Sequence, residues 1–413
     1  MNDHTDIFAS LSTKSFIDRE FWHNPYPLFD RARQESPVHW SPTFDAWILT
    51  RYADILQVLR SSKISSQRSS YKLAGLPPEE RARFSDLERS LGSWLVYMDP
   101  PRHTRVRNLV GRAFAEPVVE SLRARIGAVV DGLLDRAAQR GEMDLVRDLG
   151  SPLPTIVISE MLGATDGDRE RFERWSSDIS AFVGVGIPDL ERTRRAHESW
   201  TQMTAQVLRT AEDRRKHPRD DFISALVAQD EAGDSLDEND LVQSCVVLLF
   251  AGHETTENML STMVLSLLAN PDAARRLREN PAQIPQAMEE LFRYDSPIQK
   301  TSRIARAPLE VGGKRIEDGQ RMLLLLGAAN RDPDQFPEPD RLDLDRPTPR
   351  HMSFGFGAHY CAGAYFARVE GQIALERLLT RFPNLRLAGR SAGELPWKTS
   401  LDFRGVTSLP LLL

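Results

Sequence analysis

The segment HMSFGFGAHYCAGAYFAR, residues 351–368, contains Cys361, one of only two cysteines in the 413-residue chain. Gly355 and Gly357 precede this cysteine and Gly363 follows it, which frees the backbone to turn tightly and to approach a bound group closely. A helix is predicted directly afterwards, and its N-terminal N–H groups and positive dipole would favour a thiolate. The thiolate is the form of cysteine that binds metals, so the loop predicts a metal ligand.

Other interpretations of Cys361 are open at this point. A buried cysteine can act as a small hydrophobic residue, which composition alone favours. His359 and Cys361 could form a nucleophilic pair, although no third, orienting group is evident. Zinc usually takes about four ligands, and no second cysteine or close histidine cluster accompanies Cys361. Haem iron needs only one cysteine from the protein, because the porphyrin supplies its own nitrogens.

A second stretch with chemical potential is LLFAGHETTENML, residues 248–260. Glycine and adjacent threonines weaken an apolar helix. Threonine hydroxyls can bond to the preceding turn and bend the helix, while Gly252 leaves room for a ligand. An acid beside an alcohol, Glu254 and Thr255, could relay protons. A helix kink without function explains the same residues equally well.

The same stretch begins like a zinc hydrolase motif. His253 and Glu254 match the start of His-Glu-x-x-His, but the fifth position is Glu257, so the second zinc ligand is missing.

Charged pairs at helical spacing form a third group of candidates. Glu290 and Arg293 are three residues apart on one helix face, where an ion pair contributes about 0.2–0.5 kcal/mol. His103 and Arg107 are four apart, and Arg303 lies in a segment of strand-like sequence. Each of these residues alone is more typical of a solvated surface.

Phe354, Gly357, Cys361 and Gly363 match Phe-x-x-Gly-x-x-x-Cys-x-Gly, the haem-ligand signature of the cytochrome P450 family. The chain resembles this family from about residue 20 to its end. The resemblance implies that Cys361 is the proximal ligand of a haem b iron, to which a thiolate donates electron density that favours O–O cleavage.

The resemblance also implies roles for the other motifs. Residues 251–256 match the family's distal helix, in which Glu254 and Thr255 would relay protons. Glu290 and Arg293 match a structural Glu-x-x-Arg pair, with Arg341 as the third partner. The implied propionate contacts are His103, Arg107, Arg303 and His359, and the other implied haem contacts are Ala251, Phe354, Gly357 and Gly363.

A member of this family that lacks a membrane anchor is expected to be a monooxygenase served by a separate ferredoxin or flavodoxin and its reductase. The chain has no G-x-G-x-x-G site for a flavin or NAD. The expected reaction is insertion of one oxygen atom from O₂ into a lipophilic small molecule, by hydroxylation or epoxidation, in the tailoring of secondary metabolites such as antibiotics. Oxidative coupling or desaturation in the same fold, and a haem-binding sensor without turnover, are the alternatives.

The resemblance places a mostly apolar substrate pocket on four segments. Ordinary core packing explains the same residues about as well. The expected lining comprises Trp94, Leu95, Val96, the turn at 182–187 with Phe182 and Val183, Val247, Ala251, Pro297, Ile298 and Gln299.

Composition limits the partners and the location. Lys and Arg total 53 against 59 Asp and Glu, a net charge of −6 that gives no indication of a nucleic-acid partner. Two cysteines exclude a disulfide framework and favour a reducing compartment. The longest apolar run, residues 245–252, is far shorter than the roughly 20 residues that span a bilayer. We therefore expect a monomeric, cytoplasmic protein that does not bind membranes.

The elements that must position these motifs are mainly helical. Residues 36–41 and 45–52 predict a strand pair, and apolar residues at helical spacing dominate from about 53 to 300. Residues 301–326 predict small hairpins, and a long helix follows the cysteine loop. We expect one domain, 1–413, mainly α with a minor β portion, and the resemblance implies the triangular, helix-rich cytochrome P450 fold with small β-sheets.

Overall fold

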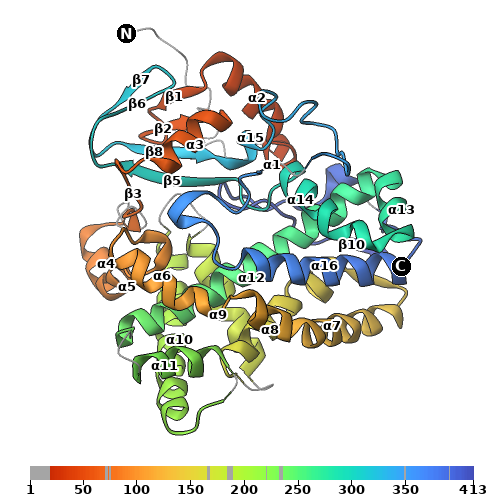
Figure 1. The fold of residues 1–413 in the computed structure, drawn as a ribbon, viewed down its shortest axis with the longest axis horizontal. Helices are drawn as coiled ribbons and strands as arrows, with labels where there is room; N and C mark the ends of the chain where they lie inside the picture. The colour runs from red at the N-terminus through yellow and green to blue at the C-terminus, as the bar shows by residue number, and fades with distance from the viewer. Residues whose placement is uncertain are drawn as a thin grey trace.

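The computed structural model describes residues 19–69, 73, 76–164, 168–183, 189–219, 221–231, 236–347, 350–389 and 391–413. Helices make up most of the molecule, and the larger sheet lies at one end with the first helices of the chain (Figure 1). The predicted fold class, mainly α with a minor β portion, is confirmed.

The larger sheet has five strands in the order β1-β2-β8-β5-β3. The predicted strand pair forms an antiparallel hairpin of β1 (Val38–Ser41) and β2 (Ala46–Leu49). β2 pairs in parallel with β8 (Arg321–Leu325), which pairs antiparallel with β5 (Lys300–Ala305). β3 (Ile64–Ser65) completes the sheet against β5. The sheet thus joins residues 38–65 to the segment that begins at residue 300.

Two smaller sheets contain the remaining strands. β6 (Leu309–Val311) and β7 (Lys314–Ile316) form the hairpin predicted around the Gly-Gly turn. β10 (Pro410–Leu412) pairs with β4 (Glu142–Asp144) and with β9 (Arg386–Leu387). The C-terminus is therefore tied to the middle of the chain.

The helices lie mostly between residue 76 and residue 300, as their apolar spacing predicts. In the described part of the chain, none of them combines the length and apolarity needed to cross a bilayer. Their bounds are α1 Arg19–His23, α2 Tyr26–Glu35, α3 Tyr52–Arg60, α4 Pro78–Arg83, α5 Ser85–Leu91, α6 Arg102–Arg112, α7 Glu116–Ala138, α8 Pro152–Met161, α9 Arg169–Val183, α10 Leu190–Lys216, α11 Phe222–Glu231, α12 Glu238–Ala269, α13 Pro271–Glu279, α14 Ile284–Tyr294, α15 Leu326–Ala329 and α16 Ala364–Arg381, with short helical turns η3 Leu95–Tyr97, η4 Val146–Gly150, η6 Pro281–Gln283, η7 Gly357–His359 and η8 Ala392–Glu394.

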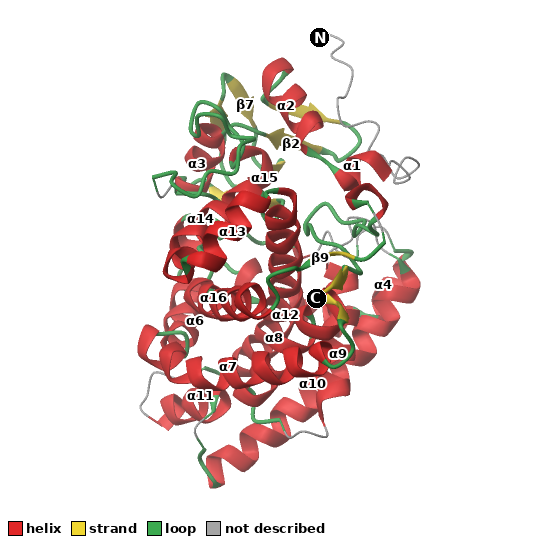
Figure 2. Cartoon of the chain, turned by 90° about the vertical axis from the view of Figure 1, so that its right-hand side faces the viewer, coloured by secondary structure: helices red, strands yellow, loops and turns green. Residues whose placement is uncertain are grey.

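Helix α12 runs through the middle of the helical part, packed against α8, α9, α10 and α16 (Figure 2). The side chain of Asp237 caps its N-terminus by accepting a hydrogen bond from the backbone N–H of Asp240 at 2.6 Å. Most of its 32 residues are buried on every side, as expected of a helix in a large core.

A buried ion cluster joins α14 to the irregular segment before the cysteine loop. The Arg293 guanidinium, fully buried, donates to both carboxylate oxygens of Glu290 at 2.7 and 2.8 Å. It also donates to the carbonyl oxygens of Asn330 and Pro339 at 3.0 and 2.8 Å. The predicted pair is therefore an internal tie between segments and not a surface pair.

The prediction that the Arg341 side chain is the third partner is wrong. Its guanidinium pairs with Glu338 at the surface, and only its carbonyl oxygen accepts from Arg293, at 3.2 Å. Arg346 takes the predicted place, with Nε 3.2 Å from Glu290 Oε1 and a side chain that is 8% exposed. The Arg341 side chain points outward, whereas the backbone N–H of Asp343 already donates to Glu290 at 3.0 Å, so the later arginine reaches the carboxylate.

Replacement of these two arginines should separate their roles. Arg346→Met leaves a buried carboxylate with one cation and leaves several buried carbonyls without a donor, so it should lower the free energy of unfolding by about 3 kcal/mol. The matched control Arg341→Met should leave that free energy almost unchanged, because its side chain is exposed. Denaturant unfolding followed by circular dichroism measures both, and equal effects would contradict this assignment.

Candidate active site

The cysteine loop is held in a tight conformation by two glycines. Gly355 and Gly357 have φ of +71° and +73°, a region that residues with a Cβ rarely adopt. A Cβ at position 357 would lie 2.8 Å from the carbonyl oxygen of Leu59 at the end of α3. The backbone N–H of Cys361 donates to the carbonyl of Phe354 at 2.9 Å and closes the loop.

The Cys361 side chain is exposed, although it lies among enough protein for burial to raise the pKa of its thiol. The backbone N–H of Gly363 and the positive charges of Arg107 and Arg368 oppose that effect. An open thiol with donors on one side is suited to bind a metal. At Gly363 the expected freedom is not needed, because its φ is −90° and a Cβ would meet only Phe114, at 3.8 Å.

Phe354 anchors the start of the loop. Its ring packs against Phe292 of α14, with ring centroids 4.6 Å apart, and Arg368 of α16 lies 4.4 Å above it. Arg368 donates to the Glu289 carboxylate at 2.6 and 2.8 Å. The loop is therefore fixed to two helices before it reaches the cysteine.

The four predicted propionate contacts come together from three parts of the chain. His103 and Arg107 lie on α6, Arg303 on β5 and His359 on the loop turn η7. The rings of His103 and His359 have centroids 4.1 Å apart. Arg68 is close enough to add its positive charge.

This cluster carries more positive than negative charge. Burial lowers the pKa of His103 to about 4 and that of His359 to about 2, and neighbouring cations contribute to both shifts. Burial and the charge of Arg68 lower the pKa of Arg303 to about 9. Asp99 is the acid that acts in the opposite direction on His103 and Arg303. The cluster would be stabilised by anions.

Unpaired polar atoms in this cluster also favour an anionic ligand. Among the described residues, neither ring nitrogen of His103, which is 1% exposed, has a hydrogen-bond partner, and neither does Nε of Arg303. Buried polar atoms are normally paired, so these positions favour an acceptor group. Haem, with two carboxylates and an iron that takes one thiolate, fits these residues.

Helix α12 exposes one stripe within its buried middle part. Val247, Ala251, Glu254 and Thr255 are half-buried, and Ala251 lies four residues after Val247 and three and four residues before Glu254 and Thr255, on one helix face. The Thr255 hydroxyl donates to the carbonyl of Ala251 at 2.5 Å. The predicted acid and alcohol therefore share this stripe.

Gly252 does not leave room for a ligand as predicted, and His253 takes part in packing and hydrogen bonding. A Cβ at 252 would overlap Cδ1 of Ile158, so this glycine permits close packing of α8 on α12, and the space is not left for a ligand. His253 is buried, with its ring nitrogens 2.9 Å from the Ser151 hydroxyl and 2.7 Å from the Ser176 hydroxyl.

Sequence reasoning missed Lys398. Its ammonium donates to Glu254 at 2.6 Å and to Glu257 at 2.7 Å. Lys398 lies 144 residues after Glu254, in a segment without a recognisable motif, so no local pattern could reveal the contact.

The predicted substrate-lining residues lie in several environments. Trp94 is buried, and its Nε1 donates to Gln243 Oε1 at 3.1 Å, whereas Val96 is exposed. Leu95 and Ile298 are half-buried and Pro297 is buried. Phe182 and Val183 end α9, and residues 184–187 of the predicted turn lie outside the described residues.

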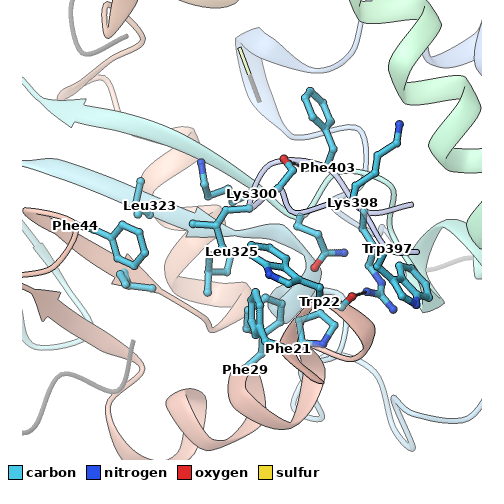
Figure 3. A pocket seen from close by; sticks show the side chains of 16 residues that line it. Phe21, Trp22, Phe29, Phe44, Lys300, Leu323, Leu325, Trp397, Lys398 and Phe403 are labelled. Atoms are coloured by element: carbon cyan, nitrogen blue, oxygen red, sulfur yellow. Dashed lines mark hydrogen bonds between the residues drawn. The ribbon is translucent and has the colours of Figure 1, made fainter. Parts of the chain in front are cut away.

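A pocket, partly open to solvent, lies between the first helices, the larger sheet and the C-terminal segment (Figure 3). Of the predicted substrate-lining residues, it includes only Gln299, and it does not include Cys361 or Thr255. Its wall is mainly apolar and aromatic, with cations at the edge. The lining residues that Figure 3 labels are Phe21, Trp22, Phe29, Phe44, Lys300, Leu323, Leu325, Trp397, Lys398 and Phe403.

Comparison with known proteins gives concordant results. A family model described as cytochrome P450 matches residues 39–385. Cytochrome P450 107B1 from Saccharopolyspora erythraea is 40% identical over 405 residues, which cover 96% of each chain. From the same organism, 6-deoxyerythronolide B hydroxylase is 35% identical over 396 residues, 95% of this chain and 96% of the relative.

A crystal structure of P450BioI, in complex with an acyl carrier protein ligated with hexadec-9Z-enoic acid, has a similar fold. Its TM-score is 0.88 at 32% identity, with 96% of this chain and 100% of that chain covered. The resemblance and the fold predicted from the sequence are therefore confirmed. The chain belongs to the cytochrome P450 family, whose members carry haem iron, and it is a monooxygenase of that family.

Proposed function

We propose that this chain binds haem b through Cys361 and inserts one oxygen atom from O₂ into a lipophilic small molecule. Electrons come singly from a separate ferredoxin or flavodoxin with its reductase. The observation that carries the proposal is the convergence of an exposed thiol with a buried cluster of arginines and histidines that has more positive than negative charge and unpaired polar atoms. Bound haem with a thiolate ligand supplies the activation of O₂.

The side chains around this group have distinct tasks in the proposal. His103, Arg107, Arg303 and His359 neutralise the two propionates. Glu254 and Thr255 relay protons from solvent along the half-buried stripe of α12, where Thr255 must give up its bond to Ala251 to pass a proton on. Because α6, β5, α12 and the cysteine loop all contribute, we propose that residues 1–413 form one domain.

The relatives support a substrate class. One is named for hydroxylation of 6-deoxyerythronolide B, and the P450BioI complex contains a hexadec-9Z-enoic acid group, which is lipophilic. The stripe of α12 includes the apolar Val247 and Ala251. We infer a lipophilic product of secondary metabolism as substrate.

The presence of both Glu254 and Thr255 favours oxygen insertion over oxidative coupling or desaturation. A sensor without turnover would bind haem but consume no NADPH when ferredoxin, reductase and ligand are supplied.

Cysteine replacement tests the iron ligand. The reduced, carbon-monoxide-bound protein should have the red-shifted Soret band of a thiolate-bound haem, and Cys361→Ser should abolish that band. The matched control Cys245→Ala changes the other cysteine, buried on α12, and should keep it. A Soret band in the wild-type protein like that of a histidine-bound haem would refute the assignment.

Replacement of the alcohol tests the proton relay. Thr255→Ala removes the hydroxyl, so protons should arrive less efficiently, and at least about tenfold more of the electrons should leave as peroxide. Thr262→Ala, two turns further along α12, removes a buried hydroxyl that bonds only to the helix backbone and serves as the control. Product and peroxide formed per NADPH measure the effect. Unchanged product yield in Thr255→Ala would count against the relay.

The cation cluster predicts how stability depends on pH and haem. The pKa of His103 in the folded protein, about 4, lies below its ordinary value of 6.5. Between these values the unfolded chain binds more protons, so the free energy of unfolding should fall as pH decreases through this window. Bound haem should reduce that loss, because its propionates raise the pKa of both histidines.

Denaturant unfolding across this pH range, with and without haem, measures the difference. His103→Phe should flatten the pH dependence of the haem-free protein, whereas replacement of the exposed His217 with Asn should not. Identical pH dependence with and without haem would contradict the proposed propionate contacts.

A further inference from the structure

Lys398 places one ammonium between two carboxylates of the distal helix. Nζ lies 2.6 Å from Glu254 Oε1 and 2.7 Å from Glu257 Oε1. The three side chains are largely buried, with exposed fractions of 15%, 14% and 10%. In Figure 3, Lys398 stands at the edge of the pocket and extends away from Trp22 and Phe29.

Backbone contacts fix the segment that positions the Lys398 ammonium. The N–H of Lys398 donates to the carbonyl of Gly405 at 3.0 Å, and the neighbouring Trp397 forms an isolated bridge with Val406. Glu254 and Glu257 are three residues apart on one helix face, where like charges repel each other. Lys398 is therefore the cation that allows both carboxylates to be ionised together.

Glu257 can keep the ammonium without Glu254. His253 Nε2 lies 3.9 Å from Glu257 Oε2, and both of its ring nitrogens face serine hydroxyls. On the other side, Asn258 Nδ2 donates to Glu254 at 3.3 Å, and Asn258 Oδ1 has no partner among the described residues. The local contacts of Glu254 are thus weak apart from Lys398.

We propose that Lys398 is a positioning residue that controls when Glu254 can carry a proton. In one state the ammonium binds both carboxylates and holds Glu254 ionised. In the other it binds Glu257 alone, and the freed Glu254 takes a proton from water and passes it toward Thr255. The new O–H bond forms with a proton from solvent, and all N–H bonds of Lys398 remain intact. The inference rests on the proposed relay.

Charged groups on the surrounding elements also affect the ionisation of Glu254 and its neighbours. Lys398 and His253 act directly on Glu254, and the other groups act on its neighbours. These are Glu173 of α9, which acts on His253, Asp144 of β4, which acts on Glu257, and Glu370 of α16, which accepts from the Thr256 hydroxyl at 3.4 Å.

The directions of the pKa shifts agree with an ammonium that Glu254 and Glu257 share. Burial would raise the pKa of Glu254, but the charge and hydrogen bond of Lys398 outweigh it and lower the pKa. Burial raises the pKa of Glu257, which shares the same ammonium. Loss of the ammonium would leave burial unopposed at Glu254, so its pKa would rise.

Two variants should move the titration of Glu254 in opposite directions. Lys398→Met should raise the pH at which Glu254 ionises by about 1–3 units. Glu257→Gln should lower it, because the ammonium then serves Glu254 alone. Lys398→Arg should retain most of the wild-type behaviour. The control is Lys300→Met, which removes another lysine of the same pocket, paired with Asp402, and should not move this titration.

The measurement has two independent readouts on the haem-loaded protein. Infrared difference spectra, with Glu254→Gln as reference, follow protonation of the Glu254 carboxyl without turnover. The fraction of electrons that reach product, measured against pH, should shift with that titration. Glu254→Gln with wild-type product yield would refute the proposed relay.

Other outcomes would overturn the inference alone. These are an unmoved infrared titration in folded Lys398→Met, shifts of the same sign in Lys398→Met and Glu257→Gln, and an equal shift in Lys300→Met. If Lys398→Met does not fold, Glu257→Gln still decides, because a titration that is unmoved or moved upward contradicts a shared ammonium.

Discussion

Buried positive charge without matching negative charge is the constraint on which the rest of this site depends. The arginines Arg68, Arg107 and Arg303 meet inside the protein around the rings of His103 and His359, although bringing charged groups out of water is costly unless anions accompany them. The protein holds them there by surrounding secondary structure, from α6, β5 and the loop turn η7. By contrast, the buried carboxylate of Glu290 is paired with Arg293 and Arg346. The difference between the two clusters supports the proposed position of the haem propionates.

The local motifs were predictable from the sequence because each lies within a few residues. The glycines around Cys361 and the Glu254–Thr255 pair could be recognised from residue types and spacing alone. The strand pair near residue 40 and the hairpins after residue 300 were predicted from alternation and turn residues, although the pairing of β2 with β8 in one sheet was not.

Contacts between distant segments were less accessible. Arg341 and Arg346 stand in the same arginine-containing stretch, and only the path of the backbone decides which one turns inward. Lys398 pairs with helix α12 across more than a hundred residues. At Gly252 the sequence indicated that a side chain would not fit, but it did not show that the close neighbour is Ile158 of α8 and not a ligand. Composition and spacing identify unusual residues, and packing decides their partners.

Gly357 allows the cysteine loop to approach the Leu59 carbonyl at the end of α3 closely. Leu59 belongs to α3, at the sheet end, whereas α12 belongs to the helical part (Figure 1). The cysteine loop thus packs against α3 and also against α14 and α16, whereas the acid–alcohol stripe lies on α12. The position of the thiol relative to α12 consequently depends on how α3, α14 and α16 pack around the loop, so substitutions at these contacts would move the thiol relative to the stripe although they lie far from it in the sequence.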